Sequence, residues 1–93
     1  MHTIRLRGPW EQQPQAGGRV CYVRRFHRPT GLDGGERVWL VVEAAAEITL
    51  NDSALGSSPG RFDVTESLGP SNTLAVSAAA HIPTDSLARL EIG

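Results

Sequence analysis

Four side chains in this sequence have the chemistry that a sugar-binding site needs. An aromatic ring stacks on the apolar C–H face of a sugar, and a planar guanidinium holds neighbouring hydroxyls through paired hydrogen bonds. Two tryptophans and two arginines suit these roles, namely Trp10, Trp39, Arg25 and Arg61. We take these four as the candidate carbohydrate-binding residues.

The acidic residues give little support for catalysis. Hydrolysis of a glycosidic bond needs two carboxyl groups held about 5–9 Å apart in a cleft. Most of the ten acidic residues, Asp33, Asp52 and Asp85 among them, fall in expected turns or at outward strand positions, where a carboxylate is solvated. Glu43 and Glu47, at adjoining strand ends, are the one pair that could lie close together. We predict no catalytic residues and no enzymatic activity.

Metal, redox and phosphate chemistry are not predicted either. His2, His27 and His81 are far apart and lack the paired spacing of a metal motif. Cys21 is the single cysteine, so it has no partner for an internal disulfide or a thiolate metal site. Neither Cys21 nor Ser53 has a neighbouring base that would make it a nucleophile. The expectation is no metal ligand and no cofactor.

The length of the chain, 93 residues, predicts one small domain that spans residues 1–93. Nine arginines, ten acidic residues and no lysine leave a formal net charge of -1. This charge argues against a nucleic-acid partner, because phosphates require a cationic surplus. The longest apolar run, 38–42, is far shorter than the roughly 20 residues of a membrane span. Since the first residues also lack the apolar core of a secretory signal, we expect a cytoplasmic protein with no membrane partner.

The elements that must position the candidates are strands. Clusters of glycine and proline divide the chain into short segments whose apolar side chains alternate, a pattern typical of an all-β fold. The expected strands, eight in number, are 3–7, 19–27, 37–43, 46–51, 54–55, 62–64, 72–79 and 86–92. Eight short strands bury their apolar faces by packing two sheets together or by closing a barrel. We predict a jelly-roll-like antiparallel β-sandwich.

Alternation also assigns side chains to faces. In 3–7, Ile4 and Leu6 share the core face. In 19–27 the core face holds Val20, Tyr22 and Phe26 but also Arg24. Two explanations for this arginine stay open: a β-bulge that shifts the register, or a stem that packs inside while the guanidinium reaches the rim.

The strand 37–43 is apolar on both faces. Its even-numbered residues are expected to face the core, which leaves Trp39 and Val41 outward, beside Val23 of the neighbouring strand. An apolar outward patch marks an interface more often than a sugar platform. Trp39, Val41 and Val23 are therefore the candidate interface residues, and an identical subunit is the simplest cover, as in a homodimer.

The order of several motifs resembles the N-terminal sugar-binding domain of glycoside hydrolase family 2, the β-galactosidase and β-glucuronidase family. The motifs are Gly8-Pro9-Trp10, the segments 22–29 and 38–43, the hairpin Ile48-Thr49-Leu50-Asn51-Asp52-Ser53-Ala54-Leu55-Gly56, and Phe62-Asp63-Val64-Thr65 followed by Asn72-Thr73-Leu74-Ala75-Val76. The resemblance covers roughly residues 8–79. It implies a galactose-binding-like jelly roll in a shortened, stand-alone form.

Departures from the family decide what the resemblance implies for function. In the large hydrolases the catalytic carboxylates lie in a separate barrel domain, which these 93 residues do not contain. The loop at 57–61 is shorter than in the family and has no aromatic residue. The resemblance therefore implies a non-catalytic module with weak carbohydrate binding or an accessory role. The alternative is a protein-interaction module with no sugar binding, which forms a homodimer or docks onto a larger hydrolase.

Overall fold

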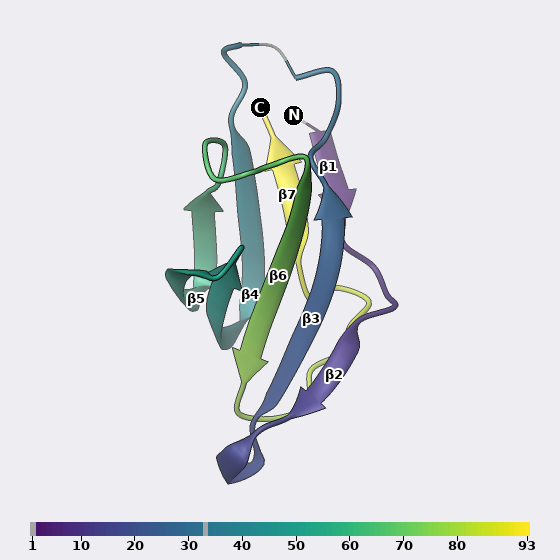
Figure 1. Cartoon of the computed structure of the whole chain (residues 1–93), viewed down its shortest axis with the longest axis vertical. Coiled ribbons are helices and arrows are strands. Elements are labelled where there is room, and N and C mark those ends of the chain that lie inside the picture. The colour runs from purple at the N-terminus through teal and green to yellow at the C-terminus, as the bar shows by residue number, and fades with distance from the viewer. Residues whose placement is uncertain (1, 33) are drawn as a thin grey trace.

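A computed structural model of the chain describes residues 2–32 and 34–93, and Asp33, predicted in a turn, lies outside them. The described residues form seven strands and one 3-10 turn (Figure 1), namely β1 (His2–Arg5), β2 (Glu11–Pro14), η1 (Ala16–Gly18), β3 (Val20–His27), β4 (Val38–Leu50), β5 (Ser53–Asp63), β6 (Ser71–Ala78) and β7 (Arg89–Ile92). Every strand pair is antiparallel. The predicted all-β, jelly-roll-like class is confirmed.

Strand β4 joins the two layers of the sandwich. Residues 38–41 of β4 pair with β7, whereas residues 47–50 pair with β6. On its other side β4 pairs with β5 through both halves, with a register shift between Val42 and Ala46. The hydroxyl of Ser58 donates to the carbonyls of Ala44 and Ala46 at this shift. The sheet order β1-β7-β4-β6-β3-β2 therefore folds over itself at β4.

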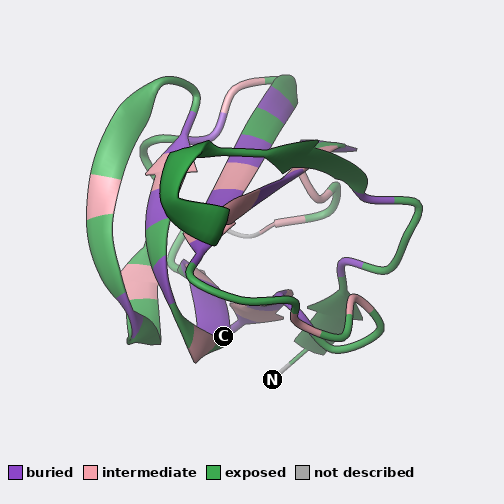
Figure 2. Cartoon of the chain, turned by 90° about the horizontal axis from the view of Figure 1, so that it is seen from below, coloured by how far each residue is buried: buried purple, intermediate pink, exposed green. Residues whose placement is uncertain are grey.

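The core lies between the two layers. Buried and exposed residues alternate along the strands, as the bands of Figure 2 show. The fully buried large apolar side chains of the strands are Tyr22, Val38, Leu40, Val42, Ile48, Leu50, Leu74, Val76 and Leu90. These positions confirm the predicted core faces of the central strands. Ile4 is an exception: it is 36% exposed because β1 is an edge strand with one neighbour among the described strands.

The number of strands differs from the prediction because two long strands replace four short ones. The segments 37–43 and 46–51 are halves of β4, since the chain bends through a bulge instead of a turn. The segments 54–55 and 62–64 likewise belong to β5, apart from Val64, which follows it. Strand β2 was not predicted because its four residues, Glu-Gln-Gln-Pro, show no alternation of apolar side chains, and all four are exposed.

The structure explains the arginine on the core face of β3. The pairing of β3 with β6 runs without a shift, so no bulge lies at Arg24. Its side chain is half-buried, and its Nε and Nη1 donate to the carbonyls of Arg7 and Arg25 at the rim. This matches the second explanation, in which the stem packs inside and the guanidinium reaches outward.

A buried asparagine connects three segments of the chain at one end of the sandwich. Asn51 and Asp52 make the predicted turn with left-handed φ angles of 50° and 67°. The Asn51 Nδ2 donates to Oδ1 of Asn72 at 3.0 Å. The amide of Asn72, which is 1% exposed, also donates to the carbonyls of Gly69 and Phe26, while its Oδ1 accepts from the Gly69 N–H. One side chain thus satisfies backbone groups of the nearby Gly69 and of Phe26 in a strand distant in sequence.

Replacing Asn72 by alanine is expected to lower the free energy of unfolding by about 1–3 kcal/mol, because buried backbone groups lose their partners. Urea denaturation followed by circular dichroism measures the change. Ser71→Ala, at the exposed neighbouring position, is the control and should unfold at the wild-type urea concentration. An Asn72→Ala protein that unfolds with the wild type would contradict this role.

Candidate functional site

The outer surface of the layer made by β1, β7, β4 and the end of β5 carries a network of charged side chains. We call it the charged face; its residues are Thr3, Arg5, Trp39, Val41, Glu43, Arg61, Asp63, Arg89 and Glu91, which alternate with the core positions. Trp39 lies opposite Asp63 and Glu91, and Val41 lies opposite Arg61 and Arg89. The apolar pair is therefore flanked by charges on both sides.

Trp39 and Arg61, two of the four carbohydrate candidates, contact each other. The guanidinium carbon of Arg61 lies 4.5 Å from the centroid of the Trp39 ring, a cation–π arrangement. The Nε of Arg61 also lies 3.5 Å from Oε1 of Glu91. Because this ion pair holds the guanidinium over the indole, a sugar that stacks there must first displace Arg61.

Glu91 links the two arginines at the centre of the charged face. Its carboxylate is 17% exposed and pairs with Arg61 and with Nε of Arg89 at 3.0 Å. The Nη1 of Arg89 reaches the carboxylate of Glu43 at 3.1 Å. These bonds, first the one to Glu91 and then the one to Glu43, raise the pKa of Arg89. Arg61, Glu91, Arg89 and Glu43 therefore form one continuous network of ion pairs.

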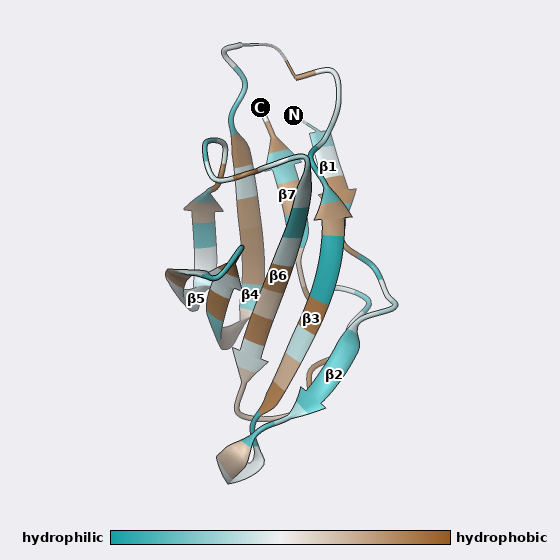
Figure 3. Cartoon of the chain, viewed as in Figure 1, coloured by the Kyte–Doolittle hydropathy of each residue, from teal (hydrophilic) through white to brown (hydrophobic). Residues whose placement is uncertain are grey.

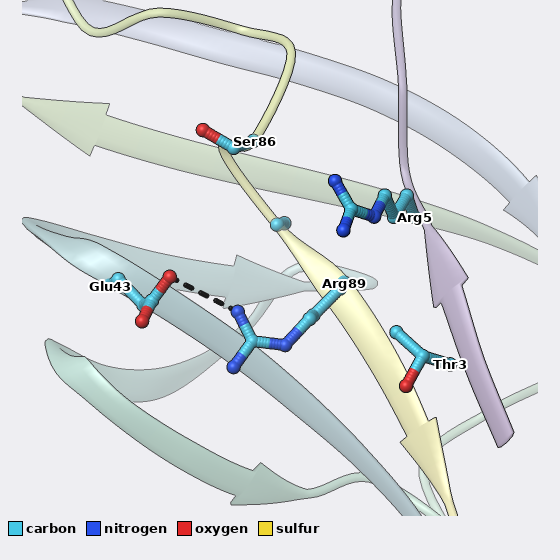
Figure 4. Close-up of a pocket in the computed structure, with 6 residues that line it drawn as sticks. Thr3, Arg5, Glu43, Ser86 and Arg89 are labelled. Carbon is cyan, nitrogen blue, oxygen red and sulfur yellow. Dashed lines mark hydrogen bonds and ion pairs between the residues drawn. The ribbon is translucent and has the colours of Figure 1, made fainter.

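A hollow of about 310 Å³ opens at the β1 end of this network. Its lining residues are Thr3, Arg5, Glu43, Ser86, Ala88 and Arg89. In Figure 4 the guanidinium of Arg5 reaches from β1 toward Ser86, and that of Arg89 points away toward Glu43. Two guanidiniums, one carboxylate and two hydroxyls thus border a space at the small end of ligand-pocket sizes.

Arg5 is the uncompensated member of this set. It lies directly opposite Arg89 in the pairing of β1 with β7, and like charges at such positions repel. Arg89 is neutralised by two glutamates, but no described residue bonds the guanidinium of Arg5. The hollow therefore contains one guanidinium without a described partner, that of Arg5, beside the paired guanidinium of Arg89.

Of the residues that line this hollow, the sequence singled out Glu43 alone. Arg5 and Arg89 occupy outward phases of the expected strands 3–7 and 86–92, so alternation gave part of the signal. The pairing of β1 with β7 is what places Arg5 opposite Arg89. That pairing joins the two ends of the chain, and no local pattern encodes it.

The other two carbohydrate candidates lie on the opposite layer. Trp10 is 8% exposed, and its indole N–H donates to the carbonyl of Leu6 at 3.0 Å, so the ring is part of the core. Arg25 is exposed and borders a broad hollow of about 690 Å³ with Trp10, Glu11 and Val23. Trp10 and Arg25 thus border one hollow and Trp39 contacts Arg61, but the structure does not unite the four.

The three interface candidates are also divided. Trp39 is half-buried on the charged face. Val41 points outward as predicted, but only 6% of it is exposed, because Arg61 and Arg89 flank it. Val23 lies on the outer side of the other layer, opposite Glu11 and Ala75. A single flat contact cannot include all three side chains.

The remaining chemistry-bearing residues do not form a common site. Glu43 lines the hollow of the charged face, whereas Glu47 lines a different hollow with Thr49 and Ser57. Within the described part of the chain, no three His, Cys, Asp or Glu residues are grouped as metal ligands. Cys21 is buried, and this burial raises the pKa of its thiol. Among the described residues no helix is long and apolar enough to cross a bilayer.

Asp63 lies at the edge of the charged face and forms the shortest ion pair among the described residues, with Arg37. Its Oδ1 accepts from the hydroxyl of Thr65 at 2.7 Å and from the Thr65 N–H at 3.1 Å. Its Oδ2 lies 2.7 Å from Nη2 of Arg37. The bond from the Thr65 hydroxyl, followed by the bond from Arg37, lowers the pKa of Asp63 to about 2.

Comparison with known proteins supports the fold and carries no further identification. No protein-family model matches the sequence, and no curated protein matches it. Among solved structures, the chain is similar to an FMN-binding beta-glucuronidase from Facaelibacterium prausnitzii L2-6, with a TM-score of 0.72 and 15% sequence identity. The match covers 98% of this chain and 22% of that enzyme chain. The predicted resemblance is thus confirmed at the level of the fold, and the chain spans less than a quarter of the enzyme's length.

Replacing Asp63 by asparagine is expected to lower the melting temperature near neutral pH. Because the folded pKa of Asp63 lies below the unfolded value of about 3.9, the carboxylate stabilises the fold above that unfolded value. This stabilisation is lost as the pH falls through about 2. Thermal melts from acidic to neutral pH measure the difference between the two proteins.

The control for this experiment is Asp85→Asn, at an exposed position. Its melting temperature should follow that of the wild type at every pH. A constant difference between wild type and Asp63→Asn down to the lowest pH would show that the asparagine acts by another route than the lost charge.

Proposed function

We propose that this chain is a non-catalytic accessory module that binds carbohydrate weakly through the hollow of the charged face. The observation that carries the proposal is the set of polar groups that meet there: Arg5, Arg89, Glu43, Thr3 and Ser86. Guanidiniums donate to hydroxyl oxygens, and a carboxylate accepts from hydroxyl protons. Neighbouring hydroxyls of one sugar ring present both kinds of partner.

Affinity at this hollow is expected to be low. The lining contains no aromatic ring, so a sugar gains hydrogen bonds but no stacking. Trp39 lies on the same face, but Arg61 covers its ring. Binding in the millimolar range, about -4 kcal/mol, fits a module that assists a larger hydrolase. The β-glucuronidase of similar fold makes glucuronides the first sugars to test, and the family resemblance adds galactosides.

Titration of the isotope-labelled protein with these sugars tests the proposal. We expect the amide resonances of Thr3, Arg5, Ser86 and Arg89 to shift saturably. Arg5→Gln should weaken binding about tenfold, because a charge-assisted hydrogen bond to the sugar is lost. Ser86→Leu should abolish binding by filling the hollow.

Both variants are expected to fold, because Arg5 and Ser86 are exposed. Ser53→Leu is the matched control, since Ser53 is exposed on β5 and does not line the hollow. It should bind as the wild type does. Absence of any saturable shift at millimolar sugar would overturn carbohydrate binding, and turnover of a glycoside would overturn the non-catalytic assignment.

Assembly through Trp39 is the second candidate function. The observation that favours it is the alternation of positive and negative side chains along β7 and β5 beside a half-buried tryptophan. Such a face can complement a second copy about a twofold axis, or a larger hydrolase that presents opposite charges.

If the chain forms a homodimer in this way, Trp39→Arg should convert it to a monomer, because a charged guanidinium replaces the apolar ring at the contact. Sedimentation velocity over a wide concentration range measures the oligomeric state. Val23→Arg, on the other layer, is the control and should leave the dimer intact. A wild-type protein that is monomeric at its highest soluble concentration would remove the homodimer hypothesis.

A further inference from the structure

The charges of this chain are separated along the sequence. Residues 1–28 contain six arginines and one acidic residue, Glu11, whereas residues 29–93 contain three arginines and nine acidic residues. Residues 1–28 are therefore strongly basic, although the net charge of the whole chain is -1. A basic part within a near-neutral chain needs a structural or a binding explanation.

The two groups of arginines also differ in their partners. The three of the later part, Arg37, Arg61 and Arg89, all pair with carboxylates. Among the described residues, the six of the first part have no carboxylate partner. Arg19, Arg24 and Arg28 bond carbonyl or hydroxyl oxygens, while no described group bonds the guanidiniums of Arg5, Arg7 and Arg25. The basic charge is thus uncompensated.

Several of these arginines border one groove between β1 and β3. The groove measures about 290 Å³ and is lined by Ile4, Arg5, Leu6, Arg24, Arg25, Phe26, His27, Pro29 and Leu90. We call it the arginine groove. Arg7 adjoins it, because its carbonyl accepts from Arg24. In Figure 3 the hydrophilic band of β3 that contains Arg24 and Arg25 lies between hydrophobic bands.

Two strand edges flank the arginine groove. Among the described strands, β1 pairs with β7 alone. Strand β2 covers β3 at residues 20–23, so residues 24–27 of β3 have no described strand on that side. Residues of β1 and of this end of β3 line the same groove. Such edges offer backbone donors and acceptors to an added extended chain.

The groove thus combines three features: free guanidiniums, open strand edges, and an apolar contact at Ile4, the exposed large hydrophobic residue of the described chain. We propose that it docks an extended, acidic segment of another polypeptide. Carboxylates of the segment pair with Arg7 and Arg25, its backbone lies along the open edges, and an apolar side chain covers Ile4. This interaction is separate from the proposed carbohydrate binding, although Arg5 borders both sites.

A polypeptide fits this groove better than other polyanions. Single-stranded nucleic acid is held by exposed aromatic rings that stack on bases, but Trp10, Tyr22 and Phe26 are buried. An acidic glycan has no backbone amides to pair with strand edges. The edges and the apolar contact at Ile4 match an extended peptide of alternating apolar and acidic residues, whose two faces differ.

A fluorescent peptide of alternating valine and glutamate tests the proposal by anisotropy at low salt. We expect saturable binding that weakens as salt is added, and none with a peptide that has glutamine in place of glutamate. The double variant Arg7→Gln with Arg25→Gln should weaken binding roughly tenfold or more. Both side chains are exposed and unbonded within the described chain, so this variant is expected to fold.

The matched control is the double variant Ser53→Glu with Ser57→Glu, which changes the net charge by the same amount at exposed positions of β5. It should bind the peptide as the wild type does. Equal weakening in both double variants would overturn a defined groove. Tighter binding of oligothymidylate or oligogalacturonate than of the peptide would overturn the peptide as its occupant.

Two further measurements separate this proposal from carbohydrate binding. Ser86→Leu should retain peptide binding, and the double arginine variant should retain sugar binding. Peptide addition should shift the amide resonances of residues 24–27 rather than those of Ser86. Peptide shifts confined to Ser86 and Arg89 would place the peptide in the other hollow and overturn the groove.

Discussion

The backbone pairing of β4 is the constraint on which the rest of the structure depends. One strand supplies hydrogen bonds to β7 through its first half and to β6 through its second half, while β5 accompanies both halves. The register shift after Val42 lets the chain change layers without breaking the ladder. Both layers, and therefore the core between them, are organised by this one bend.

The same arrangement produces two surfaces of different electrostatic character. On the charged face, arginines and glutamates lie on neighbouring strands at positions where they pair, so the opposite charges nearly cancel. Arg61, held by one of these pairs, covers Trp39. At the open side between β1 and β3, arginines meet backbone carbonyls or nothing within the described chain. Compensated charge stabilises a surface, whereas uncompensated charge is available to a partner.

The similarity to a β-glucuronidase concerns the part of the molecule that makes the fold. At 15% identity, what the two chains share is the path of the backbone. The motifs behind the resemblance serve that path here: Asn51 turns the chain and Asn72 satisfies buried backbone groups. Function resides in side chains that the fold leaves free to vary. The proposed sites therefore rest on this chain's own residues.

The sequence by itself determined the class of the fold and most of its core. Alternation is a local property, because successive side chains of a strand point to opposite faces, so Tyr22, Phe26 and Leu40 could be placed inside without knowing their neighbours. The turn at Asn51 and Asp52 was likewise readable, since these residue types tolerate left-handed backbone.

Only the tertiary structure decided which outward side chains meet. The partners of Trp39, Arg5 and Arg89 come from strands distant in sequence, and Val23 was separated from Trp39 because their strands lie in different layers. Strand β2 escaped prediction because it is held by backbone pairing to β3 and buries no side chain. Register between distant strands depends on the packing of the whole chain, and no local pattern of residues records it.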